Sequence, residues 1–252
     1  MKSVPIEFYP KAVSFSANEV FGTCPYSYYR QKIVKDIPYV EGKEAAWGNV
    51  LHNAIEKAIK EHRLIGAETY KDPETGKEVT NDLSWLNQYF VPFVSFAESN
   101  GYTLEAEKEI CFSKPPFQKS DWFKAWWRTK SDVVAVSPDK AHVVYSDWKT
   151  GNRKSRSVSK YQKQMRYAAL ALMIAYPEAQ KVDTSLCWIK ENGKMDGLSF
   201  TRADIPKLLD EFATDVNEIA YAIQNNSWPK KKSGLCRGYC SVQDCSNWEE
   251  RK

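Results

Sequence analysis

The spacing of apolar residues predicts that the first part of the chain is helical. Three segments carry apolar residues at helical spacing: 14–34, 44–65 and 83–100. Pro25 is expected to break the first of these helices, and Pro92 to kink or break the third. The polar stretch 66–82 is expected to form an exposed loop or a hairpin.

The pattern of the later part predicts strands mixed with two long helices. Short segments rich in β-branched and aromatic residues predict five strands: 103–112, 122–136, 141–148, 181–190 and 195–202. Amphipathic helices are predicted at 157–176 and 204–226, and a turn is predicted at 137–140. This order of elements predicts an α/β protein with a helical N-terminal part.

The composition is that of an ordinary globular protein. The chain has 252 residues, of which 42% are hydrophobic and 27% are charged. We expect one domain, residues 1–252, with a helical part at 1–100, an α/β core at 101–225 and a cysteine-rich tail at 226–252. Since no apolar run reaches the length of a membrane span and the N-terminus lacks the apolar core of a signal peptide, we expect a cytoplasmic protein with no membrane partner.

Two acids stand in neighbouring predicted strands. Asp132 lies inside one strand and Asp147 near the end of the next, so a hairpin between them would bring both carboxylates together. A buried acid is costly unless it is paired or binds a metal, and clustered carboxylates suit Mg²⁺ or Mn²⁺. Lys149 completes the only Asp-x-Lys triplet of the chain, although about one such triplet is expected by chance.

His52 could add a nitrogen ligand to these acids. It lies on the second predicted helix, where the small residues Gly48 and Ala54 would permit close approach to a neighbouring element. A single histidine on a helix is more often structural or exposed, so the helix alone does not decide its role.

Basic residues are concentrated after Lys149. The net charge is only +4, but seven basic residues and no acidic one occur from Lys149 to Arg166. Such a run is either a solvated face or a contact surface for a phosphate backbone.

Four short motifs in order resemble a known family. The segments "GNVLH", "KSDVVAV", "YSDWKTG" and "QMRYA" resemble the PD-(D/E)xK nucleases of the RecB-like branch, which includes the RecB and AddB nuclease domains, CRISPR-associated exonucleases and phage exonucleases. The resemblance runs from about Cys24 to Cys245 and implies a restriction-endonuclease-like core, in which helices flank a central mixed sheet. It implies that His52, Asp132 and Asp147 bind the divalent metal with the Trp148 carbonyl, while Lys149 acts on the attacking water.

The same resemblance implies a set of DNA contacts. Gln164 and Tyr167 on the following helix would touch DNA or the catalytic lysine, and the basic run that contains Arg153, Lys154 and Arg156 would contact the DNA backbone. The glutamine and tyrosine usually stand four residues apart and here stand three apart, and a core position for Tyr167 remains equally open. Relatives often have an acid at the place of Glu107, for which a solvated strand face is the simpler interpretation. Three tryptophans, Trp126, Trp127 and Trp148, could stack on unpaired bases, or pack in the core.

The six cysteines fall into two groups. Cys111 and Cys187 lie in apolar strands and are expected to pack in the core. The others resemble the cysteines of the AddB and CRISPR-associated branches, which hold a 4Fe–4S cluster: Cys24, Cys236, Cys240 and Cys245. The resemblance therefore implies a C-terminal cysteine clasp that closes onto Cys24; a structural Zn²⁺ site or unligated thiols are the alternatives.

Together these features predict a metal-dependent DNA exonuclease. It would act in the recombination or repair of DNA in a phage or a mobile element. Its partner would be a single-strand annealing protein or another recombination protein, in the cytoplasm of a bacterium or of a phage-infected host. The alternatives are a CRISPR-associated nuclease that trims prespacers, a structure-specific endonuclease, and a catalytically silent DNA-binding module.

Overall fold

The computed structural model describes residues 4–38, 41–153 and 155–250, and of residues 155–157 the backbone alone. The chain divides into two compact units, each built from separate segments. One, which we call the sheet unit, comprises Glu41–Cys111 and Thr129–Leu208. The other, the terminal unit, comprises Met1–Val40, Phe112–Arg128 and Leu209–Lys252.

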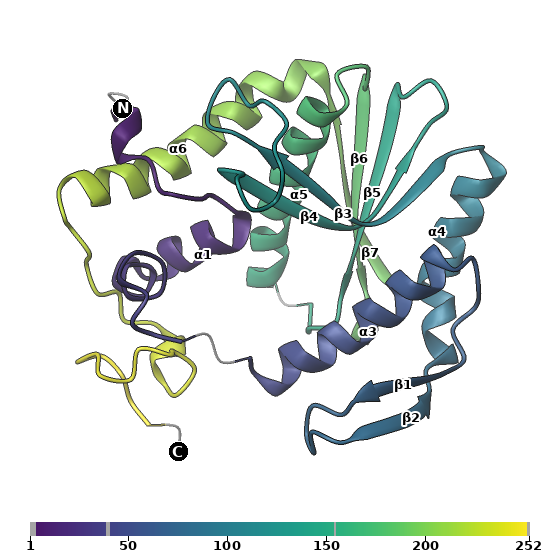
Figure 1. Ribbon diagram of the computed structural model, residues 1–252, viewed down its shortest axis with the longest axis horizontal. Helices are drawn as coiled ribbons and strands as arrows, with labels where there is room; N and C mark the ends of the chain where they lie inside the picture. Colours follow the sequence, from purple (N-terminus) through teal and green to yellow (C-terminus); the bar gives the residue numbers. More distant parts are fainter. Residues whose placement is uncertain (1–3, 39–40, 154, 251–252) are drawn as a thin grey trace. The chain divides into compact units, whose positions relative to one another are not determined.

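A five-stranded mixed sheet organises the sheet unit (Figure 1). Its strands, in spatial order, are β3 (Thr103–Phe112), β4 (Trp127–Val136), β5 (His142–Lys149), β6 (Lys181–Trp188) and β7 (Lys194–Thr201). β5 pairs antiparallel with β4 and parallel with β6, and β6 pairs antiparallel with β7. The five predicted strands and the mixed sheet are confirmed, except that residues 122–126 form a turn region before β4 and residues 189–190 belong to a 3-10 helix after β6.

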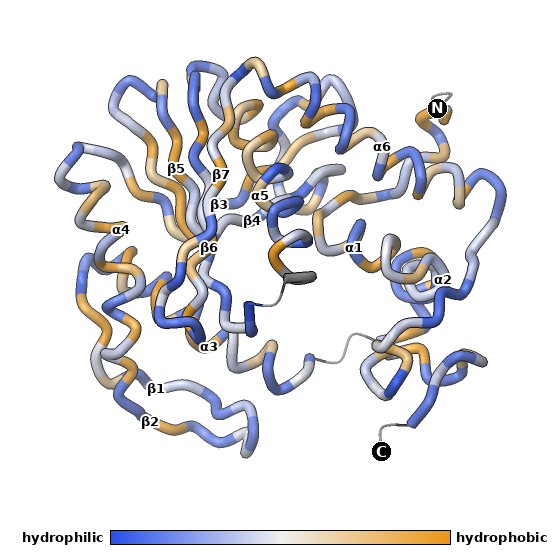
Figure 2. The backbone as a smooth tube through the Cα atoms, turned by 180° about the vertical axis from the view of Figure 1, so that it is seen from behind, coloured by the Kyte–Doolittle hydropathy of each residue, from blue (hydrophilic) through white to orange (hydrophobic). Residues whose placement is uncertain are grey.

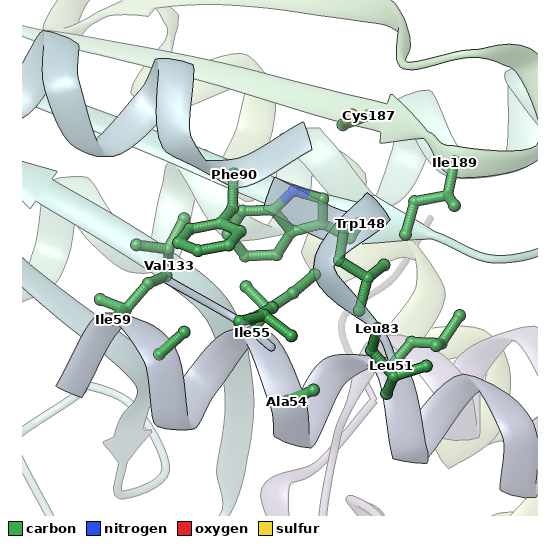
Figure 3. Close-up of a cluster of buried hydrophobic side chains, with 13 residues drawn as sticks. Leu51, Ala54, Ile55, Ile59, Leu83, Phe90, Val133, Trp148, Cys187 and Ile189 are labelled. Atoms are coloured by element: carbon green, nitrogen blue, oxygen red, sulfur yellow. The ribbon is translucent and has the colours of Figure 1, made fainter. Parts of the chain in front are cut away.

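Two helices cover one face of this sheet. They are α3 (Lys43–Lys60) and α4 (Asn87–Ser99), and α4 continues through Pro92. Helices and strands together form a buried cluster that includes Leu51, Ile55, Phe90, Val133 and Trp148. In Figure 3 the side chains of α3 point toward the Trp148 ring, which lies at the centre of the cluster. Burial of these apolar surfaces holds α3 against the strands.

The crossover helix α5 (Ser155–Ala175) packs through Met165 against Leu186 and Trp188 of β6. Cys187, the residue between them, belongs to the cluster beneath α3. Since successive strand residues point to opposite faces, α3 and α5 cover opposite faces of the sheet. A parallel strand pair needs such a crossover, and the predicted amphipathic helix supplies it.

The polar stretch 66–82 forms a hairpin of two strands, β1 (Ala67–Lys71) and β2 (Glu78–Asp82), which are paired antiparallel. Its loop is hydrophilic (Figure 2). Asp72 Oδ1 accepts hydrogen bonds from the backbone N–H groups of Glu74 and Thr75 and from the Thr75 hydroxyl, at 2.7–3.1 Å. These bonds fix the turn, as acidic turn residues commonly do.

The terminal unit contains both ends of the described chain. Its helices are α1 (Phe15–Thr23), α2 (Pro25–Tyr28), a π-helical turn at Tyr29–Val34, and most of α6 (Ile205–Gln224). Ser14 caps α1 by accepting a hydrogen bond from the Ala17 N–H, and Cys24 separates α1 from α2, so the break predicted near Pro25 is confirmed. Among the described residues, no helix is long and apolar enough to cross a membrane.

The tryptophans proposed for base stacking are all buried. The exposed fraction is 4% for Trp126, 0% for Trp127 and 2% for Trp148. Trp126 and Trp127 pack in an aromatic cluster of the terminal unit with Phe117 and Phe212. A stacking role for these three rings is therefore wrong, because burial in a packed core leaves no ring face for a base.

Candidate active site

The β4–β5 hairpin places the two predicted acids side by side. Its register pairs Val133 with Ser146, and the residues that flank this pair are Asp132 and Asp147. The Trp148 N–H donates a hydrogen bond to Asp132 Oδ2 at 2.8 Å, which fixes the carboxylate at the end of the hairpin. The predicted turn is present, since the Lys140 N–H bonds to the Ser137 carbonyl at 2.8 Å.

α3 brings His52 to Asp132. The distance from His52 Nδ1 to Asp132 Oδ1 is 3.2 Å. One helical turn earlier, a Cβ on Gly48 would lie 3.0 Å from the Thr150 side-chain oxygen, so only a glycine fits without a shift. The close approach predicted from the small residues of this helix is thus present at Gly48.

Glu107 joins these two residues in a group that could hold a metal ion. In the part of the chain that the structure describes, the group consists of His52, Glu107 and Asp132, whose ligand atoms all lie within 4.8 Å of one another. The Glu107 side chain is only 13% exposed and forms an ion pair with Lys130. The solvated position expected for Glu107 is therefore wrong. Its backbone is left-handed, with φ of 52°, which interrupts the alternation of a regular strand.

Asp147 and Lys149 form a buried pair beside this group. The exposed fraction of Asp147 is 4%, and its Oδ1 lies 2.5 Å from Lys149 Nζ. Asp147 Oδ2 accepts hydrogen bonds from the Tyr145 hydroxyl at 2.7 Å and from Gln164 Nε2 at 2.8 Å. Lys149 Nζ also donates to Gln164 Oε1 at 3.0 Å and lies 4.5 Å from the centre of the Tyr161 ring. Every polar group of the pair is thus held in one orientation.

The charges of these residues follow from burial and from one another. Burial raises the pKa of Asp147, and the neighbouring Asp132 charge raises it further. Burial lowers the pKa of Lys149, but Asp147 and Asp132 outweigh that effect and leave it raised, so the ammonium is charged at neutral pH. Burial likewise lowers the pKa of His52, but the hydrogen bond to Asp132 together with the charges of Asp132 and Asp147 outweighs that effect and leaves the pKa raised.

The donor set fits a hard divalent cation. It offers one imidazole nitrogen and two carboxylates, and Asp147 is a further buried carboxylate whose Oδ1 faces the Lys149 ammonium. Carboxylate oxygens are the ligands that hard divalent cations prefer. Asp147 lies outside the three-residue group, and the roles of Asp147 and of the Trp148 carbonyl as ligands stay predictions.

The sequence profile of the PD-(D/E)XK nuclease superfamily matches residues 12–245, most of the chain. This chain belongs to that superfamily.

One solved structure, of a candidate exonuclease, shares its fold, and two others match with lower scores. A candidate exonuclease from Eubacterium rectale matches with a TM-score of 0.53 and 10% identity, over 90% of this chain and 86% of that protein. The alkaline exonuclease LHK-Exo of Laribacter hongkongensis matches with a TM-score of 0.34 and 12% identity, over 88% and 96%. Its complex with dAMP matches with a TM-score of 0.35 and 10% identity, over 88% and 94%. No curated protein matches the sequence at a significant level. The mixed sheet and its helices are the nuclease fold that the motifs predict.

The residues predicted to contact DNA in this nuclease have different surroundings. Gln164 bonds to both Asp147 and Lys149, as described above. Arg153 forms two hydrogen bonds of 2.8 Å with the Asp196 carboxylate, so most of its guanidinium is already engaged. Tyr167 is buried, with 3% exposed. Lys154 and the Arg156 side chain lie outside the described residues. Contacts of these five residues with DNA stay predictions.

Two tyrosines of the site were not predicted. Tyr161 lies one helical turn before Gln164 and contacts Lys149. The tyrosine predicted from the sequence was instead Tyr167, which lies after Gln164. Tyr145 stands two residues before Asp147, and residues at this spacing share one face of a strand. That spacing was the available signal for Tyr145.

We expect Tyr145→Phe to lower the Mn²⁺ affinity of the nuclease about tenfold, as loss of such supporting hydrogen bonds does. Burial holds the pKa of Tyr145 well above its ordinary value, so the hydroxyl stays a donor to Asp147. Tyr176→Phe is the matched control, since Tyr176 donates to Glu105 Oε1 at 2.9 Å. Titration of Mn²⁺ against both variants checks this; equal affinities would contradict it.

Metal affinity is expected to fall on acidification. A metal ligand must be unprotonated, and the raised pKa of His52 means that protons compete with the cation already above about pH 6.5. Calorimetric titration between about pH 6 and 8 should show protons released on Mn²⁺ binding, most of them at the acidic end. His52→Asn should bind the metal more weakly and lose this dependence. A wild-type affinity that does not change with pH would contradict the prediction.

Proposed function

We propose that this nuclease is a metal-dependent DNA exonuclease that hydrolyses phosphodiester bonds at DNA ends. The observation that supports it most is the buried Lys149 ammonium, held against Asp147 beside the His52–Glu107–Asp132 group. A bound divalent cation would neutralise the scissile phosphate and activate water.

The residues of the chain would have separate tasks in this reaction. His52, Glu107 and Asp132 would hold the cation, and Asp147 is the further acid nearby. Lys149 is the one described cation fixed beside Asp147, and it would stabilise the negative charge that grows on the phosphate in the transition state. Gln164 would keep the ammonium in place through its hydrogen bond.

A digestion time course tests the activity. Linear DNA labelled at either end and closed circular DNA are incubated with Mg²⁺ or Mn²⁺ and wild type, Asp132→Asn or Asp183→Asn. Asp183 lies at the opposite end of the sheet, bonded to His142, so its variant is a matched control. Loss of linear DNA from its ends, with circles intact and Asp132→Asn inert, supports the exonuclease and gives its polarity. Cleaved circles would favour an endonuclease, and no cleavage at all would favour a binding module.

We further propose that the terminal unit holds a 4Fe–4S cluster, with Zn²⁺ as the alternative. Cys24, Cys236, Cys240 and Cys245 are free thiols. Cys240 Sγ lies 4.0 Å from the hydroxyl of Ser27, one turn after Cys24, and Cys236 Sγ accepts the Ser233 N–H at 3.5 Å.

The two alternatives hold the four sulfurs at different distances. Tetrahedral zinc with bonds of about 2.3 Å would draw its ligands to within about 4 Å of one another. A cluster separates its cysteines more widely, because each thiolate binds a different iron.

Anaerobic purification with metal analysis tests the cluster. We expect about four irons per chain, their loss in Cys245→Ser, and no loss in Cys187→Ser. Cys187 is the matched control, since burial raises the pKa of its thiol to about 11 and leaves it neutral. Zinc without iron would support the alternative, and neither metal would indicate unligated thiols.

The biological setting is part of the same proposal. We place the enzyme in the bacterial or phage-infected cytoplasm, with a single-strand annealing or other recombination protein as partner. Affinity capture of the inert Asp132→Asn protein with DNA tests it. Recovery of an annealing protein would support the recombination role, and recovery of CRISPR adaptation proteins would support prespacer trimming instead.

A further inference from the structure

A cleft of about 740 Å³ opens beside Lys149 within the sheet unit. Its walls come from the start of α3, the β1–β2 hairpin, the loop after β5 and Tyr161 of α5. Thr150 and Gly151, which line the cleft, directly follow Lys149, and Tyr161 contacts the Lys149 ammonium. The volume lies in the range of about 300–1,000 Å³ that small organic ligands occupy. Any group in this cleft would therefore lie next to the reacting phosphate.

Three aromatic side chains line the cleft. Trp47 and Tyr70 form a T-shaped pair with ring centroids 5.5 Å apart, and both are partly exposed. Tyr161 is also partly exposed. Aromatic rings in a site for single strands bind bases by stacking, with little dependence on sequence.

The charges of the cleft disfavour a phosphate as its main occupant. Three acids, Glu44, Asp72 and Glu74, stand against two lysines, Lys43 and Lys190. The backbone N–H groups of Thr75 and Glu74 lower the pKa of Asp72, so its charge persists at neutral pH. Carboxylates repel a phosphate but accept hydrogen bonds from the N–H groups of a neutral base.

We propose that this cleft binds the unpaired base of the nucleotide at or next to the scissile phosphate, through Trp47 and Tyr70. This inference rests on the proposed DNA exonuclease activity. A paired base is stacked inside the duplex, so only an unstacked base can present its face and edge to the cleft. The enzyme therefore acts on single-stranded or frayed DNA ends, with the backbone at Lys149 and the base between the aromatic walls.

A cycle of protein and substrate changes tests the contact. Trp47→Leu and Tyr70→Leu keep an apolar side chain for packing but remove the ring, and Trp85→Leu is the matched control, an exposed tryptophan outside the cleft. The substrates are single strands that are intact or lack one base at the first, second or third position from the end. For the intact strand we expect both cleft variants to lose about tenfold in kcat/KM, while the control keeps its rate. On a strand abasic at the position that occupies the cleft, wild type and variants should become equal.

A binding measurement without cleavage separates the two proposals. With the metal chelated, wild type should quench the fluorescence of a terminal 2-aminopurine by stacking, and both cleft variants should quench it less. If wild type digests DNA but the variants match it on every substrate and in quenching, the cleft proposal is overturned and the nuclease remains. If wild type digests no DNA yet quenches through Trp47 and Tyr70, the base site stands and the exonuclease proposal fails.

Discussion

Lys149→Met is expected to lower the single-turnover rate of DNA cleavage by at least about a hundredfold, the usual effect of removing one preorganised group that stabilises transition-state charge. The Lys149 ammonium lies 2.5 Å from Asp147 Oδ1 and bonds to Gln164, so its position is set before substrate binds. Methionine has a similar length and preserves the contact with Tyr161, so the change removes mainly the charge.

Metal binding should survive this substitution. The ammonium repels a cation that binds nearby, and its removal leaves Asp147 without its counter-charge, so we expect Mn²⁺ affinity to be equal or higher. Lys181→Met is the matched control. In the sheet register Lys181 lies opposite His142, at the other end of β5 from Lys149. Its ion-pair partner, Asp183, is far from the metal group along the strand. A Lys149→Met rate within about threefold of wild type would show that the lysine has no catalytic role.

Local sequence patterns were sufficient to predict which strand ends carry the acidic residues of the site. Asp132 and Asp147 could be placed together because a short turn joins their strands, and this hairpin fixes the register. The role predicted for His52 came from the resemblance carried by the GNVLH motif, because the helix alone did not decide it; in the structure Gly48, one helical turn earlier, allows the helix to approach Thr150. The mixed sheet likewise came from the resemblance, and α5 is the crossover that its parallel strand pair requires.

Contacts that depend on irregular backbone or on distant partners could not be predicted. Glu107 turns into the metal group through a left-handed backbone that only its neighbours impose, and no glycine marks the position. Arg153 was assigned to DNA as one of a basic run, yet its guanidinium bonds to Asp196, which lies on another strand. A basic run in sequence therefore does not establish a free basic surface.

The aromatic cluster of the terminal unit should account for the largest loss of stability. We expect Trp127→Ala to reduce the free energy of unfolding by about 3–5 kcal/mol, the usual cost of truncating a buried large aromatic side chain. Trp127 is fully buried, with its ring centroid 4.3 Å from that of Phe212, 5.3 Å from that of Phe112 and 5.7 Å from that of Phe117. Alanine would leave a cavity among these rings.

Packing rather than hydrogen bonding should cause this loss. Trp127 Nε1 has no hydrogen-bond partner among the described groups, so removing the indole N–H relieves a buried unpaired donor. Trp127→Phe, which keeps a ring and loses that donor, should therefore cost clearly less than Trp127→Ala. Phe123→Ala, at an 89% exposed position, should change stability by less than about 0.5 kcal/mol. Urea unfolding followed by circular dichroism measures all three. Equal losses for Trp127→Ala and Trp127→Phe would mean that the cluster does not stabilise the terminal unit by packing around this ring.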